Sequence, residues 1–123
     1  PLNRLAAAIR TGGGILFADC AQSAMRLPLP DADMIAISAH KFGGPPGVGA
    51  LLIRHLGAIA PSGGQEQGYR GGTENLPAIL GMAAALEQEI EWMDDAADLR
   101  EELDEAITAA GGEVIAKSSP RIA

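Results

Sequence analysis

The chain has 123 residues, enough for one compact domain, and its 47% apolar and 20% charged residues are typical of a folded protein. Its single cysteine excludes a disulfide framework and a cysteine-cluster metal site, and we expect no metal. The net charge of −7 argues against a non-specific nucleic-acid binder, and no apolar run has the length of a membrane span. We therefore expect a soluble cytoplasmic protein that binds neither nucleic acid nor membrane.

The first part of the chain alternates between helical and strand-like patterns. Residues 2–10 predict the end of a helix, which the glycines at 12–14 close. Apolar runs at 15–18, 34–38 and 48–54 predict three short strands that are buried on both faces. Such strands need layers of helices on both sides, so the pattern predicts an α/β fold.

The apolar spacing changes from Leu76 onward. Apolar residues between positions 79 and 97 recur every three or four residues, which predicts one helical stripe. Thr73 or Asn75 can cap this helix, and Pro77 falls in its first turn, where a missing N–H costs little.

The acidity of the chain is confined to one segment. Residues 87–105 contain ten acidic residues and one basic residue, Arg100, so they carry a net charge of −9 and the other residues carry +2. Residues 99–107 continue a helical stripe as far as the glycines at 111–112. We interpret the acidic run as the solvent face of these helices and not as a partner site.

Polar residues follow the first two expected strands. Asp19 comes directly after the first strand, at the carboxyl edge where open α/β sheets bind ligands, although a lone aspartate there is more often a helix cap or turn former. Gln22 can donate or accept a hydrogen bond three residues later. The second strand ends in Ser38, followed by His40 and Lys41. A buried lysine there can form a Schiff base, whereas an isolated His-Lys pair is more simply a surface feature.

Two glycine-rich segments complete the pattern. Residues 43–49 lack the Gly-Lys-Ser/Thr ending of a phosphate loop and precede a strand instead of a helix, which excludes that motif. The second segment, 63–75, brings Arg70 and Thr73 to the start of a helix, where free N–H groups favour a phosphate or carboxylate.

These features together resemble the class V aminotransferases, the pyridoxal-phosphate enzymes of fold type I, and among them the cysteine desulfurases most closely. The resemblance extends over nearly the whole chain and rests on five motifs in a fixed order. The motifs are Asp19-x-x-Gln22, Ser38-Ala39-His40-Lys41, Gly47-Val48-Gly49, Gly63-Gly64-Gln65-Glu66 and Arg70-Gly71-Gly72-Thr73-Glu74-Asn75.

The resemblance implies a role for each candidate residue around pyridoxal 5′-phosphate. Lys41 would hold the cofactor covalently and act as the general acid and base. Asp19 would pair with the pyridine nitrogen, which makes the ring an electron sink, and Gln22 would bind the phenolic oxygen. The phosphate would be bound by Ser38 and His40 of the same subunit. Thr73 would contact the phosphate in the partner subunit, which implies a homodimer.

The resemblance also implies an activity and a domain organisation. A desulfurase releases alanine from L-cysteine and passes the sulfur to a cysteine thiolate, to supply iron–sulfur clusters or thiolated cofactors through acceptor or scaffold proteins. We expect Cys20 to be a small buried apolar residue instead of that nucleophile. The chain would be an interior fragment: residues 1–93 from the large cofactor-binding domain, with a mostly parallel sheet, and 94–123 from the start of the small C-terminal domain.

Two other interpretations stay open. A selenocysteine lyase or another class V aminotransferase would share every residue above. Alternatively, the 123-residue chain is a non-catalytic truncated product, which would be inactive alone because a partial sheet leaves edges and faces uncovered.

Overall fold

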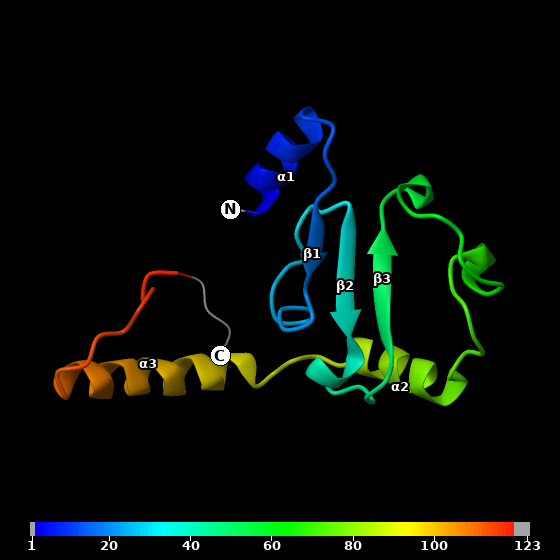
Figure 1. Ribbon diagram of the computed structural model, residues 1–123. Helices are drawn as coiled ribbons and strands as arrows, with labels where there is room; N and C mark the ends of the chain where they lie inside the picture. Colours follow the sequence, from blue (N-terminus) through cyan, green and yellow to red (C-terminus); the bar gives the residue numbers. More distant parts are fainter. Residues whose placement is uncertain (1, 120–123) are drawn as a thin grey trace. The chain divides into compact units, whose positions relative to one another are not determined.

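The computed structural model describes residues 2–119 and divides the chain into two compact units, Pro1–Gln88 and Glu89–Ala123. The first unit contains a three-stranded sheet and two helices, and the second contains one long helix (Figure 1). The assignment of residues 1–93 and 94–123 to large and small domains remains a prediction, because compactness does not identify the domains of a longer chain.

The first helix agrees with the sequence pattern. Helix α1 spans Leu2–Thr11 and buries Ala6 completely. It ends in glycines whose N–H groups return to the last helical carbonyls, as Gly14 N does to Ile9 O at 2.9 Å. Gly13 has a φ of +75°, a left-handed conformation that favours glycine, so the sequence stops the helix where the pattern predicted.

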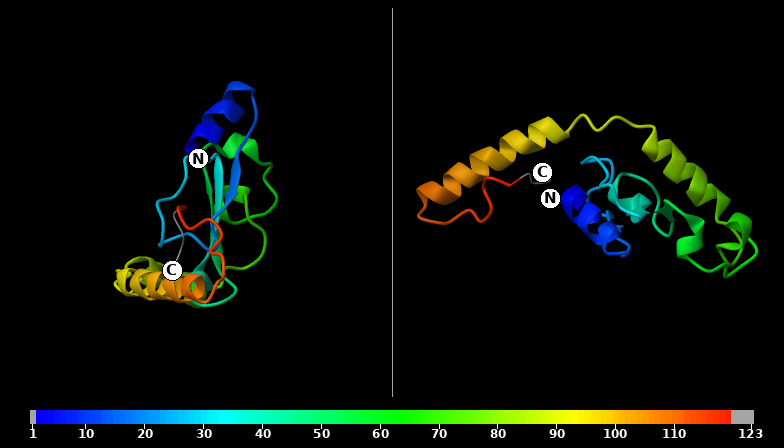
Figure 2. Two further views of the ribbon diagram at one scale, coloured as in Figure 1. Left: turned by 90° about the vertical axis from the view of Figure 1, so that its left-hand side faces the viewer. Right: turned by 90° about the horizontal axis from the view of Figure 1, so that it is seen from above.

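The three strands lie in the order β1-β2-β3, with β1 at Phe17–Asp19, β2 at Met34–Ser38 and β3 at Gly49–Ile53. Strands β1 and β2 are parallel, whereas β2 and β3 are antiparallel. In the side view of Figure 2 the strands overlap one another, as expected for a single layer. The described strands therefore form a small mixed sheet, and the mostly parallel sheet stays a prediction for the whole large domain. Residues 39–48 are too few for the helical crossover that a parallel β3 requires.

The buried core is small and rests on small side chains. Ala18, Cys20, Ala32 and Ile35 form its buried cluster, and Cys20 is only 4% exposed. By contrast, Leu51 of β3 is 47% exposed. The described residues therefore do not cover both faces of the sheet, as the apolar runs led us to expect.

Helix α2 spans Leu76–Leu86, and Asn75 caps it by accepting a hydrogen bond at Oδ1 from Ala78 N at 3.3 Å. The sequence predicted either Thr73 or Asn75 as the cap, and in the structure Asn75 caps the helix. Gly81 lies against the proline of the glycine-rich loop, because a Cβ added there would be 3.0 Å from Pro45 Cγ.

The single helical stripe expected across residues 79–97 is interrupted, because α2 ends at Leu86 and the next helix begins at Met93. Glu87, Glu89 and Glu91 follow α2, where negative charge opposes the helix dipole. Two aspartates instead occupy the first turn of the next helix, where negative charge is favourable.

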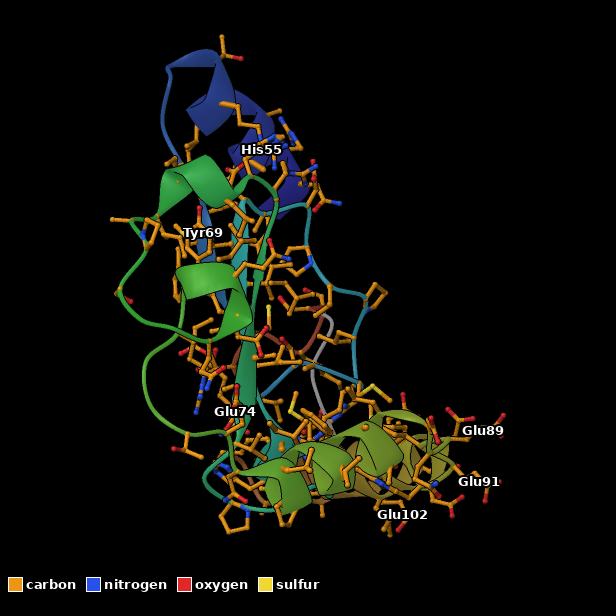
Figure 3. All side chains as sticks on the ribbon, turned by 90° about the vertical axis from the view of Figure 1, so that its right-hand side faces the viewer. His55, Tyr69, Glu74, Glu89, Glu91 and Glu102 are labelled. Atoms are coloured by element: carbon orange, nitrogen blue, oxygen red, sulfur yellow. The ribbon has the colours of Figure 1, made fainter. Side chains whose placement is uncertain are left out.

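The second unit contains helix α3, Met93–Ala109. Glu89, Glu91 and Glu102 are exposed and project from the ribbon in Figure 3, which agrees with a solvent-facing acidic run. Asp104 is the exception, since it is 4% exposed. The apolar residue Leu99 is 65% exposed, so the stripe of α3 is not buried by the described residues. Among residues 2–119, no helix is long and apolar enough to cross a membrane.

Candidate functional site

Strand β1 ends in the first candidate residue. Asp19 is the last residue of β1 and its side chain is exposed. Its Oδ1 accepts a hydrogen bond from Ala21 N at 2.9 Å, so Asp19 does form the turn that the simpler interpretation predicted. Gln22 follows in the same turn and is also exposed. Asp19 Oδ1 makes this turn contact, whereas Asp19 Oδ2 makes no hydrogen bond within the described residues.

Strand β2 ends in three further candidates. Ser38 is its last residue, and His40 and Lys41 lie in the 3₁₀ turn that follows. Ser38 Oγ lies 3.0 Å from His40 Nδ1, so these two side chains are in hydrogen-bond contact. Because β1 and β2 are parallel, Asp19 and Ser38 come to the same edge of the sheet.

We call this set of five residues the polar edge: Asp19, Gln22, Ser38, His40 and Lys41. Two neighbouring parallel strand ends and the turns after them carry a carboxylate, an amide, a hydroxyl, an imidazole and an amine, of which the hydroxyl and the imidazole are in hydrogen-bond contact. Such groups can hold an anion, protonate a ring nitrogen and supply a nucleophile.

Lys41 is half-buried and is followed by a loop that backbone hydrogen bonds close. Phe42 N and Gly44 N both donate to Ala39 O, at 3.1 and 2.9 Å, and Ala39 is completely buried. Gly43 has a φ of +91°, which requires glycine in practice. Strand β3 follows at Gly49, which confirms that this loop is not a nucleotide-binding phosphate loop.

Thr73 does not join the polar edge through any hydrogen bond of the described residues. It is exposed in the segment between β3 and α2, next to Glu74, which Figure 3 labels. Gln65 and Arg70 form a local bridge earlier in this segment, and Arg70 Nη1 donates to Gly72 O at 3.1 Å. The backbone contacts therefore fix the segment locally, while the role of Thr73 stays a prediction.

Sequence reasoning overlooked Arg26. This half-buried arginine lies in the connection between β1 and β2, and its Nη2 donates to Lys41 O at 3.0 Å. A single charged residue within the otherwise apolar run 24–29 was a signal that could have identified it.

Sequence reasoning also overlooked a cluster of charges at the opposite edge, which we call the charge clasp: Arg10, Asp31, Asp33 and Arg54. Arg10 pairs with Asp31 at 2.8 Å and with Asp33 at 2.9 Å. Arg54 Nη2 is also paired with Asp31, and Arg54 Nε lies 3.6 Å from Asp33. The clasp joins α1 to the start of β2 and the end of β3.

Asp33 also fixes the start of β1 against β2. Its Oδ2 accepts from Leu16 N at 2.9 Å, and its own N–H donates to Leu16 O at 2.9 Å. The hydrogen bond from Leu16, followed by that from Arg10, lowers the pKa of Asp33. Hydrogen bonding to Arg10 is the largest cause that lowers the pKa of Asp31, and these bonds raise the pKa of Arg10.

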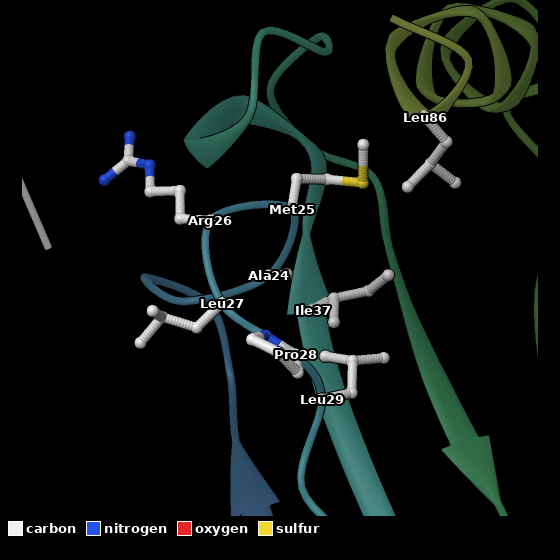
Figure 4. A pocket seen from close by; sticks show the side chains of 8 residues that line it. All are labelled: Ala24, Met25, Arg26, Leu27, Pro28, Leu29, Ile37 and Leu86. Carbon is white, nitrogen blue, oxygen red and sulfur yellow. The ribbon is translucent and has the colours of Figure 1, made fainter. Parts of the chain in front are cut away.

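An apolar cavity of about 460 Å³ lies beside the sheet, and none of the polar-edge residues lines it (Figure 4). It lies between the connection that follows β1, Ile37 of β2 and Leu86 at the end of α2. Arg26 is the one charged residue among the described residues of its otherwise apolar lining, which offers little else to orient a polar substrate, so we place the chemistry at the polar edge instead.

The comparisons with known proteins agree on one family. The family model for class V aminotransferases matches residues 1–110. A cysteine desulfurase of Rhodobacter capsulatus is 40% identical, over 91% of this chain and 32% of that protein. The structure of SspA in complex with cysteine matches with a TM-score of 0.67 and 29% identity, over 82% of this chain and 33% of that one.

A NifS-like protein from Rickettsia africae ESF-5 has the same fold, with a TM-score of 0.80 over 98% of this chain and 37% of that chain. Its identity of 24% supports likeness of fold alone. The chain spans between about a quarter and a third of the length of the curated relatives it matches.

Proposed function

Because the chain belongs to the class V aminotransferase family, as its motifs predicted, we propose that the protein containing it is a pyridoxal-phosphate-dependent cysteine desulfurase. The reaction converts L-cysteine to L-alanine while a thiol becomes a persulfide. One observation carries the proposal: a chain 40% identical to a cysteine desulfurase gathers the polar edge from two parallel strand ends.

The side chains of the polar edge fit this cofactor chemically. The phosphate needs donors without a negative charge, and Ser38 and His40 supply a hydroxyl and an imidazole in mutual contact at 3.0 Å. The pyridine nitrogen needs a carboxylate, and Asp19 supplies one from the neighbouring strand end. The carbonyl carbon of the cofactor needs an amine, which Lys41 supplies from a half-buried position.

Asp19, Gln22 and Lys41 would each act on a different part of the cofactor or the substrate. When bound, pyridoxal phosphate supplies an electron sink for the negative charge that develops at the substrate Cα. Asp19 keeps the ring nitrogen protonated, and Gln22 binds the phenolic oxygen. Lys41 Nζ would hold the cofactor and, once free of it, would take the proton from the substrate Cα.

The sulfur acceptor is proposed to be a thiol other than Cys20. Cys20 is 4% exposed and packs in the core with Ala18 and Ile35, so it cannot approach a substrate at the polar edge. The persulfide would supply an iron–sulfur cluster or a thiolated cofactor through a sulfur-acceptor or scaffold protein. We also propose a homodimer in which exposed Thr73 reaches the phosphate bound by the other subunit.

The test is production of alanine from L-cysteine by the full-length protein that contains this chain, in the presence of pyridoxal phosphate. Lys41→Ala is expected to abolish turnover with the fold retained. Lys117→Ala is the matched control, because Lys117 is the other lysine of the chain, is exposed and lies in the second unit. Turnover of selenocysteine without turnover of cysteine, or full activity of Lys41→Ala, would contradict the proposal.

A further inference from the structure

One charged side chain connects the two turns of the polar edge. Arg26 is the last residue of the turn at 21–26 after β1, and its Nη2 donates to the backbone oxygen of Lys41 at 3.0 Å. The two residues are 15 positions apart, so this bond joins the turn after Asp19 to the turn after Ser38. A hydrogen bond from a charged donor is stronger than one between neutral groups.

The carbonyl of Lys41 is a suitable point from which to hold this turn. The other side of the turn is already fixed, because Ala39 N donates to Val48 O at 3.1 Å and Ala39 O accepts from Phe42 and Gly44. These bonds hold the start and the end of the turn. Arg26 holds Lys41 itself, and so relates its Cα to the strand end that carries Asp19.

The backbone before Arg26 is shaped for this contact. Met25 has a φ of +66°, a left-handed conformation that is costly for a residue with a Cβ. In Figure 4 the Arg26 guanidinium points away from Met25, Ile37 and Leu86, the apolar residues on the other side of the connection. The reversal at Met25 thus directs the Met25 side chain and the Arg26 guanidinium to different sides of the connection.

We propose that Arg26 is a positioning residue for Lys41. It fixes the backbone from which the Lys41 amine extends, relative to Asp19. The inference rests on the proposed function, because only there does Lys41 hold the cofactor. Arg26 also lines the apolar cavity, but that contact does not require a charged residue, because a methionine could make it equally well.

The test compares Arg26→Met, Arg26→Lys and Arg4→Met in the full-length protein that contains this chain. Arg4 is the matched control because it is exposed on α1 and undergoes the same chemical change. Arg26→Met is expected to lower kcat by about 10- to 100-fold, with KM for L-cysteine within about twofold of wild type. Arg26→Lys, which keeps a charged donor, is expected to recover most of kcat.

Hydrogen exchange provides a readout without the cofactor. The amides of Phe42 and Gly44 should exchange faster in Arg26→Met and remain unchanged in Arg4→Met, because the turn at 39–44 loses its second attachment. Unchanged exchange, unchanged kcat, or equal loss of kcat in Arg26→Met and Arg26→Lys would each overturn the inference. Absence of cofactor bound to Lys41 in the wild-type protein would instead overturn the proposed function, and the exchange result would still show whether Arg26 holds the turn.

Discussion

At Met25 we expect a glycine substitution to be less destabilising than an alanine substitution, which is the reverse of the usual order. Met25→Ala and Met25→Gly both remove the side chain, so the loss of its contacts cancels when the two variants are compared. Alanine retains the cost of the left-handed backbone at φ +66°, about 1–2 kcal/mol, whereas glycine does not. Glycine adds entropy to the unfolded chain, which costs about 0.4–1 kcal/mol. We therefore expect Met25→Gly to be more stable than Met25→Ala by about 1 kcal/mol.

Leu27 is the matched control in the same connection. It is 38% exposed, and it is not among the described non-glycine residues with positive φ. Leu27→Gly should therefore be less stable than Leu27→Ala, by about 0.4–1 kcal/mol. Urea unfolding of the full-length protein that contains this chain, followed by circular dichroism, should show opposite orders at the two positions.

The expected difference at Met25 corresponds to a change of roughly 0.3–1 M in the urea midpoint. If alanine were the more stable residue at both positions, the left-handed conformation of Met25 would be refuted. The explanation of how the chain directs Arg26 toward Lys41 would then lose its support.

Two further predictions concern the charge clasp and the cap of α2. The pKa of Asp33 is lowered on folding, so its contribution to stability is present above the ordinary aspartate value of 3.8 and is lost as the pH falls through the folded-state pKa. At pH 6 the urea midpoint of Asp33→Asn should therefore be lower than that of the wild type, and below pH 3.8 the two midpoints should approach each other. A difference in midpoint that does not change with pH would contradict the ionic role of Asp33. Asn75→Ala should cost about 1 kcal/mol by removing the bond to Ala78 N, whereas Thr73→Ala should cost little, as thermal unfolding can show. Equal losses from the two substitutions would show that Asn75 is not the principal cap.

The sequence was sufficient where local chemistry determines the structure. The apolar run at 34–38 coincides with β2, and the triple glycine after α1 ends that helix as expected. The gap between α2 and α3 was missed because apolar spacing continues across it. The gap is indicated instead by the positions of the acidic residues, which follow the end of α2 and occupy the first turn of α3.

The features that apolar spacing could not predict depend on the length of a connection or on contacts between distant residues. The antiparallel direction of β3 follows from the length of its connection, which apolar patterning ignores. The charge clasp joins Arg10 to Asp33 across 23 positions, and Arg26 reaches Lys41 across 15. No local pattern marks such pairs. The parallel pairing of β1 and β2 brings Asp19 and Ser38 to one edge, while the role of each residue there is still a prediction.

Borohydride reduction of the full-length protein with pyridoxal phosphate, followed by peptide mapping, tests directly whether Lys41 holds the cofactor. Reduction fixes the cofactor to the amine that holds it. The chain contains two lysines, Lys41 and Lys117, so within it the map has two possible positions. We predict that the label is on the peptide that contains Lys41. A label on Lys117, or on a lysine outside this chain, would show that Lys41 does not hold the cofactor.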